Sequence, residues 1–385
     1  MQYFCVGAQK DRMSQIDAKK LTSTYIGNHD MFISAIDSYG NLIDRKKVTL
    51  VVVDNEALTL TKNILCIGDS LTNNGLIVST CGEHFKELGG EQPVFIGQRA
   101  SYDYKHEGYP GYSFSSFATD SRGYSYTIFD VPQGTNVSVE DIYSINDVDY
   151  TIKNIRTEGL DNKLRLRCES SKSSTLSETD SLVKKSGNSS SDNNILYSAA
   201  EKESGNPFWN KKTSSIDFAE YRKKMDMGNA KFDVIVIMLG TNDCVGGIKP
   251  AMQKSVKYAV RLIDSILDDA GDYPTKIILQ LCPQDANTIS SWHIMSDSSR
   301  DNASGLKIGY WNNIWALRRL LYTEFTKEKW KNKVYLGQAA LGIDRYYGYP
   351  YTMVESSSRI NIKEVFHDNS VHPNLHSLEM VITCR

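Results

Sequence analysis

A serine at the end of an apolar run is the first residue of this sequence whose surroundings favour chemistry. The run reads Ile64-Leu-Cys-Ile-Gly-Asp-Ser-Leu71 and leads into a helical pattern. Open α/β sheets bind their ligands at the carboxyl ends of parallel strands. Gly68 permits a tight turn, and the N-terminus of the following helix favours negative charge on a reacting oxygen. Ser70 is therefore a candidate nucleophile, although an N-cap would have the same appearance.

Three later segments supply the other groups that acyl transfer needs. They are residues 106–113 (HEGYPGYS), 238–243 (MLGTND) and 368–374 (DNSVHPN). The first is a glycine-rich turn with Gly111, and the second places Asn242 at another strand end. The third offers His372 with Asp368 and Asn369 beside it. A nucleophile, a base, a group that orients the base and donors for the oxyanion together favour a serine hydrolase.

These segments resemble the sequence blocks of the SGNH, or GDSL-type, esterases and lipases. The matches are Gly68–Leu71, Gly111, Gly240–Asp243 and Val371–Asn374, within about residues 62–375. The resemblance implies that Ser70 attacks an ester carbonyl and that His372 acts as general base and then acid. It also implies an oxyanion site formed by the backbone N–H groups of Ser70 and Gly111 and by the side chain of Asn242.

The resemblance further implies a substrate and a biological setting. A metal-free, cofactor-free enzyme of this kind would remove a small acyl group, acetyl above all, from a carbohydrate or another small ester. Residues 205–209, 217–221 and 342–344 are similar to SGNH proteins of bacteriophages and gut bacteria. That likeness would fit assembly on a virion or a cell surface.

Two departures from the family pattern bear on the mechanism. The family usually has Asp three residues before its histidine, whereas this chain has Asn369 there and Asp368 one residue further back. Asparagine can orient an imidazole but cannot compensate its positive charge. Either Asp368 reaches His372, or a Ser–His pair is supported by Asn369 or the backbone. The family's closing helix is also not evident after Asn374. An alternative function is thus a glycan-binding or structural, phage tail-type protein with a weakened site.

Three further residues are candidates for substrate contact. His106 and Tyr112 flank the Gly111 turn, and Trp292 lies in a loop after a predicted strand. Aromatic faces suit the apolar faces of sugar rings, but such residues are just as often part of the core. No histidine spacing repeats a zinc signature such as HExxH, so we predict no catalytic metal.

Composition excludes several other classes of function. The 385 residues carry a formal net charge of −2, which gives no bulk attraction to nucleic acid or an anionic membrane. No apolar run is long enough to span a bilayer. The seven scattered cysteines contain no CxxC pair and argue against a disulfide framework. The first residues lack the pattern of a signal peptide, so we expect synthesis in the cytoplasm, with the final location open.

The order of apolar and polar runs predicts the architecture. Residues 1–60 read as a small antiparallel β module with a hairpin around Gly40. Residues 61–385 alternate strands and helices, which predicts a three-layer αβα sandwich with a parallel, flavodoxin-like sheet. This SGNH-type domain is interrupted at about 119–204 by a β-rich, serine-rich insertion, of which residues 170–191 read as a mobile surface loop.

Overall fold

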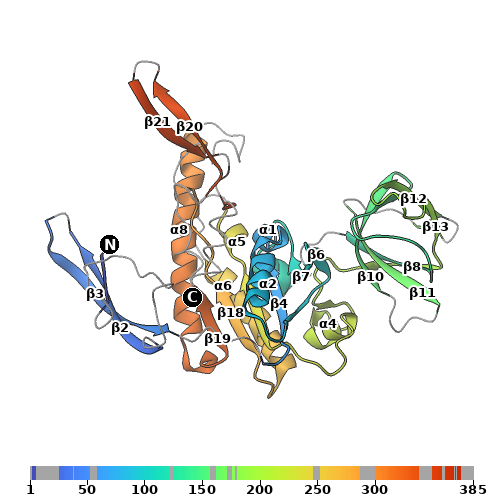
Figure 1. Ribbon diagram of the computed structural model, residues 1–385, viewed down its shortest axis with the longest axis horizontal. Coiled ribbons are helices and arrows are strands. Elements are labelled where there is room, and N and C mark those ends of the chain that lie inside the picture. The colour runs from blue at the N-terminus through green and yellow to red at the C-terminus, as the bar shows by residue number, and fades with distance from the viewer. Residues whose placement is uncertain are drawn as a thin grey trace.

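The structure is a computed structural model of the chain. The residues that it describes are 2–5, 26–37, 39–52, 59–120, 125–156, 162–170, 176–177, 180–245, 252–286, 300–337, 349–357, 360–367, 369 and 371–373. Figure 1 shows a central sheet with helices around it, a second sheet to one side and β-hairpins further out.

The central sheet has the strand order β19-β18-β17-β4-β7-β6, and β5 also pairs with β4. Its strands are β4 (Asn63–Gly68), β5 (Val94–Ile96), β6 (Arg99–Ser101), β7 (Tyr104–Gly108), β17 (Val234–Met238), β18 (Lys276–Gln280) and β19 (Val334–Gly337). All pairs are parallel except β6 with β7. The parallel strands therefore follow the flavodoxin-like order 2-1-3-4-5, whose ligand site lies where β4 and β17 meet.

The helices are α1 (Ser70–Asn73), α2 (Leu76–Leu88), α3 (Phe114–Ala118), α4 (Phe218–Lys224), α5 (Thr241–Cys244), α6 (Gln253–Ala270), α8 (Arg300–Phe325) and a 3₁₀ turn at Glu328–Trp330. Ile67 of β4 shares a core cluster with Leu262 of α6 and Leu317 of α8. Its neighbour Cys66 packs with Val78 of α2. Because successive strand residues point to opposite faces, apolar helices cover both faces of β4. The chain is a mixed α/β protein with a largely parallel sheet, as predicted.

The inserted segment forms an antiparallel sheet of its own, with the order β13-β12-β9-β10-β11-β8-β14. The strands are β8 (Ser125–Pro132), β9 (Ile142–Ile145), β10 (Val148–Arg156), β11 (Lys163–Ser170), β12 (Ser181–Ser186), β13 (Asn194–Leu196) and β14 (Ala199–Glu203). The edge strands β13 and β14 are separated in the chain by Tyr197 and Ser198 alone, so the sheet curls around its core. The prediction of a loop over residues 170–191 is wrong at Ser181–Ser186, which form β12.

The insertion leaves and re-enters the α/β part at one place. The side chain of Asn206, after the insertion, donates to the carbonyl of Phe117, before it, at 2.7 Å. Arg99 of β6 forms an ion pair with Glu169 of β11 at 2.8 Å and donates to the hydroxyl of Tyr126 at 2.8 Å. These buried polar contacts fix the curled sheet against the edge of the central one.

Smaller sheets lie outside these two parts. They are β1 (Gln2–Cys5) with β2 (Gly27–Ile36) and β3 (Leu42–Val52), β15 (Trp209–Asn210) with β16 (Ser215–Ile216), and β20 (Tyr351–Ser357) with β21 (Ile360–His367). The hairpin predicted around Gly40 joins β2 to β3, and the Asp37 carboxylate accepts from the backbone of Tyr39 and Asn41. The domain boundary near residue 60 stays a prediction.

The core of the central sheet makes a first prediction about stability. Ile237 of β17 is fully buried, whereas Ile308 of α8 is 57% exposed. Ile237→Ala should lower the free energy of unfolding by about 2–5 kcal/mol, because it leaves a cavity among close-packed side chains. Ile308→Ala should change it by less than about 0.5 kcal/mol. Denaturant unfolding followed by circular dichroism measures both, and equal effects would contradict the assigned core.

Candidate active site

The turn after β4 presents Ser70 at the carboxyl end of the strand. A Cβ atom on Gly68 would collide with the side chain of Thr72 and come within 2.9 Å of the carbonyl oxygen of Met238, so only glycine fits. Asp69 caps α1 by accepting a hydrogen bond from the backbone N–H of Leu71 at 3.0 Å. Ser70 begins α1 and is half-buried, which leaves its hydroxyl within reach of solvent.

The segment after β7 lies directly beside this turn. The backbone N–H of Tyr109 donates to the carbonyl of Gly68 at 2.9 Å. The N–H of Tyr112 then donates back to the carbonyl of Tyr109 at 3.1 Å, with Pro110 and Gly111 between them. Gly111 has a φ of +77°, as the third position of a type II turn requires. The glycine-rich turn predicted from sequence is therefore present and held close to Ser70.

Asn242 joins the third strand end to the other two. It lies in α5, the short helix that follows β17. Its Nδ2 donates to the carbonyl of Tyr112 at 2.8 Å and approaches Oδ2 of Asp69 at 3.4 Å. The structure thus brings together Ser70, the Gly111 turn and Asn242, the three groups expected to surround an oxyanion.

His372 reaches Ser70 from a segment 302 positions further along the chain. Its Nε2 lies 2.7 Å from the hydroxyl oxygen of Ser70, and both side chains are half-buried. Burial lowers the pKa of the His372 imidazole below its ordinary value of 6.5. The ring is therefore neutral at neutral pH, which is the charge state a general base needs.

Asn369 holds the other side of the imidazole. Its Oδ1 accepts hydrogen bonds from the backbone N–H groups of Val371 at 3.0 Å and His372 at 2.9 Å. Its Nδ2 lies 3.1 Å from Nδ1 of His372. The two backbone donors fix the orientation of the amide, because a flipped amide would turn N–H groups toward other N–H groups.

This orientation determines the tautomer of His372. An amide nitrogen can only donate, so Nδ1 of the neutral imidazole must accept from Asn369. The single ring proton then lies on Nε2, where it points toward the Ser70 hydroxyl. In that tautomer His372 donates to the serine instead of accepting its proton. The geometry of a Ser–His pair is present, but its resting protonation is the reverse of the one that activates a nucleophile.

Two buried carboxyl groups, those of Asp69 and Asp243, lie next to the site. Asp69 is 1% exposed, and burial, with a further contribution from the charge of Asp243, raises its pKa to about 7. Asp243 accepts from the backbone N–H of Phe114 at 3.1 Å, at the start of α3. Both carboxyl groups therefore accept hydrogen bonds at helix starts.

The remaining candidates are placed as follows. His106 is fully buried, with its ring nitrogens bonded to Ser101 and to the N–H of Gly108, and burial, aided by Arg99, lowers its pKa to about 4. Tyr112 is 3% exposed and donates to a backbone carbonyl. Neither side chain presents a surface to a substrate here, because both are enclosed by the protein. Asp368 and Trp292 lie outside the described residues.

Sequence reasoning missed the buried carboxylate of Glu107. It accepts hydrogen bonds from the hydroxyls of Tyr109 at 2.7 Å and Tyr221 at 2.6 Å, and from the backbone N–H of Gln98 at 2.7 Å. These bonds fix β7 just before the Gly111 turn, so Glu107 positions the turn. A charged residue next to a strand-end glycine was the signal in the sequence.

Among the residues that the structure describes, no three His, Cys, Asp or Glu side chains gather as metal ligands would. Within those ranges, no helix has the length and apolar character to cross a bilayer.

Comparison with known proteins gives structural matches alone. No protein-family model and no curated protein matches the chain. A carbohydrate acetylesterase from Sinorhizobium meliloti, Est24, aligns at a TM-score of 0.34 and 11% identity, over 84% of this chain and 95% of that one. A peptidoglycan O-acetylesterase aligns at a TM-score of 0.34 and 10% identity, over 85% of this chain and 89% of that one.

The lowered pKa of His372 predicts the pH dependence of Ser70 reactivity. The imidazole stays neutral to pH values below 6.5. The rate at which a fluorophosphonate labels Ser70 should therefore fall only below that pH. In Asn369→Asp the new negative charge favours the imidazolium, so the acidic limb should move to higher pH. Labelling rates across a pH series measure both limbs. A wild-type limb above 6.5, or no shift in the variant, would contradict the assignment.

Proposed function

We propose that this protein is a serine esterase that hydrolyses a small acyl ester, with Ser70 as nucleophile and His372 as general base. The 2.7 Å contact between the Ser70 hydroxyl and Nε2 of His372 carries the proposal. Its position adds support, because Ser70 follows β4 and Asn242 follows β17 at the switch point of the sheet, where open α/β sheets bind ligands.

The reaction would proceed in two halves. Ser70 Oγ attacks the carbonyl carbon while its proton passes to Nε2 of His372, and the imidazolium then protonates the leaving alcohol. Water, deprotonated by His372, releases the acid from the acyl-enzyme. An amide nitrogen carries two hydrogens, and Asn242 uses one on the carbonyl of Tyr112. The other approaches Oδ2 of Asp69 at 3.4 Å and would leave that carboxyl group to bind the oxyanion with the N–H groups of Ser70 and Gly111.

The finer parts of the proposal follow from the motif resemblance. They are an SGNH-type three-layer fold, acetyl as the acyl group and a carbohydrate as its carrier. The location of the protein, including assembly on a virion or a cell surface, is part of the same proposal. Fold-level likeness is an associational argument, so these parts need a direct substrate test.

Asn369 implies that turnover is slow. For His372 to accept the serine proton, its ring proton must move to Nδ1 and then face the Nδ2 hydrogens of Asn369 at 3.1 Å. That arrangement loses a hydrogen bond and opposes two donors. The same observation favours the second candidate function, a glycan-binding protein whose SGNH-type site is weakened. The two functions differ in whether Ser70 reacts at all.

Substitution of the pair tests the esterase directly. Ser70→Ala should abolish the single fluorophosphonate adduct and the release of acetate from acetylated xylan or peptidoglycan. His372→Ala should lower both by at least about a thousandfold, because the hydroxyl loses its base. Intact-mass analysis and acetate release measure the outcomes. Absence of any adduct on folded wild-type protein would overturn the esterase in favour of the binding protein.

Replacing the amide of Asn369 by a carboxylate should increase activity. Asn369→Asp offers an acceptor to Nδ1, so the ring proton moves there and Nε2 becomes free to accept from Ser70. We expect labelling to accelerate about 10- to 1,000-fold, since the reverse change in a serine protease triad costs about 10⁴-fold. Asn229→Asp, at an exposed position, makes the same charge change as a control. An unchanged rate would show that Asn369 does not set the tautomer.

A further inference from the structure

A basic cleft lies between the inserted sheet and the α4 region. One hollow of about 400 Å³ is lined from the insertion by Arg165 and Arg167, and from the α/β part by Trp209 and residues 211–212. A second hollow of about 380 Å³ shares Asn154, Lys224 and Met225 with it. The two hollows therefore form one continuous cleft with walls from both parts of the chain.

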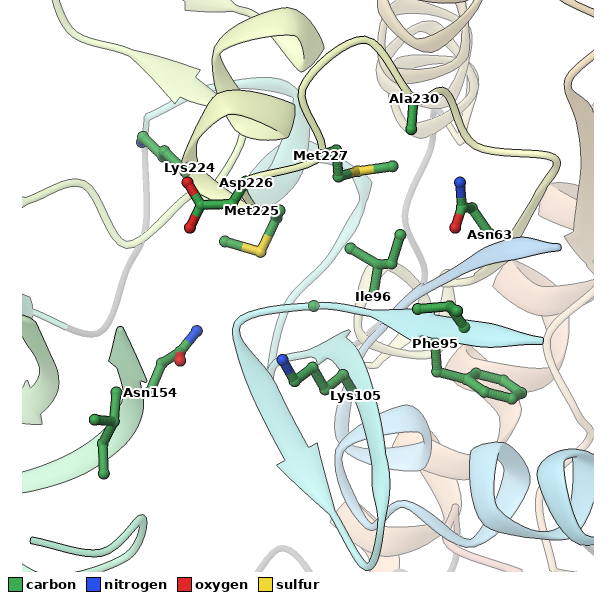
Figure 2. A pocket seen from close by; sticks show the side chains of 13 residues that line it. Asn63, Phe95, Ile96, Lys105, Asn154, Lys224, Met225, Asp226, Met227 and Ala230 are labelled. Atoms are coloured by element: carbon green, nitrogen blue, oxygen red, sulfur yellow. The ribbon is translucent and has the colours of Figure 1, made fainter. Parts of the chain in front are cut away.

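Figure 2 shows the second hollow from close by. Asn154 of β10 and Lys105 of β7 lie on opposite sides of the open space, with Met225 between the walls. Asn63, the first residue of β4, also lines it. Gly68, the last residue of that strand, is about 17 Å away at the strand rise of about 3.3 Å per residue, and Ser70 lies two residues beyond it. The cleft is separate from the candidate active site.

Charge distinguishes this cleft from the rest of a nearly neutral molecule. Its first hollow is lined by five cationic side chains and by Glu220 as the acidic one. The cations are Arg165, Arg167, Lys211, Lys212 and Lys224. Arg165 donates two hydrogen bonds to Asp130 at 2.7 and 2.9 Å. Lys211 and Lys212 are exposed. Concentrated positive charge in a concave site attracts an anionic ligand.

A buried amide adds a second requirement on the ligand. Gln98 lines the first hollow, is 2% exposed, and its Oε1 has no hydrogen-bond partner in the described structure. A buried acceptor without a partner destabilises the fold, and a donor from a ligand would satisfy it. A ligand hydroxyl is such a donor. The lining of the cleft therefore favours a ligand that carries hydroxyl groups as well as negative charge.

Trp209 provides an aromatic surface in the same hollow. The side chain is half-buried in β15 and lines the space beside residues 210–212. An indole face packs well against the apolar C–H face of a sugar ring, while its rim tolerates polar neighbours. The cleft thus combines an aromatic surface, an amide oxygen that can accept from a hydroxyl, and several cations. This combination matches a sugar that carries acidic groups.

We propose that this cleft binds an acidic saccharide, a sugar unit that carries carboxylate, phosphate or sulfate groups. The ring would lie on Trp209, its acidic group would meet Lys211 and Lys212, and a hydroxyl would donate to Gln98. The two hollows together suit a short oligosaccharide. A nucleic acid fits less well, because the net charge of −2 gives no broad electrostatic attraction. The cleft would hold a polymer independently of chemistry at Ser70.

Binding measurements on the full chain test the proposal. The probes are trigalacturonate, a phosphorylated and a sulfated disaccharide, the neutral trisaccharide maltotriose and a single-stranded oligonucleotide. Calorimetry and tryptophan fluorescence should show binding of at least one acidic saccharide, weakened by high salt, and much weaker binding of maltotriose. A tighter affinity for the oligonucleotide, or no preference of any acidic probe over maltotriose, would overturn the proposal.

Variants locate the binding. Lys211→Gln with Lys212→Gln should lower the affinity for the acidic probe at least about tenfold, and Trp209→Ala should do the same. The control, Lys254→Gln with Lys257→Gln on the exposed side of α6, removes the same charge elsewhere and should bind normally. Ser70→Ala should also bind normally, which separates this cleft from the esterase site. If both lysine double variants weakened binding equally, the effect would come from the overall charge of the protein, and the proposed site would be overturned.

Discussion

The parallel register of β4 with its two neighbours is the constraint on which the candidate active site depends. Gly68 is level with Met238 of β17 on one side and with Gly108 of β7 on the other. Three chain segments therefore leave the sheet at one height, and Ser70, the Gly111 turn and Asn242 meet there. A side chain at Gly68 would force β4 and α1 apart, so the smallest residue is the one that permits this convergence.

The position and the protonation of the His372 ring both depend on Asn369. The position of the His372 ring follows from Asn369, whose Oδ1 accepts from two backbone N–H groups. The same anchoring turns Nδ2 toward the ring and places the proton on the nitrogen that faces Ser70. A carboxylate in that place could accept from the backbone and the ring at once, because both its oxygens are acceptors. The Nδ2 group of Asn369 thus leaves the short Ser70–His372 contact with its ring proton on the nitrogen that would have to accept from the serine.

The sequence predicted the central strands well because buried parallel strands are continuous apolar runs, as in β17. The start of the long helix α8 is harder to predict, since polar and glycine residues in its first turns, such as Gly305, conceal a pattern that Tyr310 and Leu317 make clear. Strand β12 was missed because serine composition outweighed the alternation around the buried Leu182. The Ser–His approach was suggested by motifs, but the direction of the Asn369 amide depends on atoms that no spacing reveals.

The attachment of the insertion explains why the cleft keeps exposed positive charge. Burying Glu107 raises its pKa, and the charge of Arg167, with the two tyrosine hydroxyls, opposes that rise. Arg167 also lies 3.5 Å over the ring of Tyr126 and is 5% exposed, so its guanidinium is largely enclosed by the protein. Lys211 and Lys212 are the exposed lysines of the first hollow. Buried arginine therefore helps to join the two parts of the chain, and the exposed lysines are the charges that the proposed saccharide would meet.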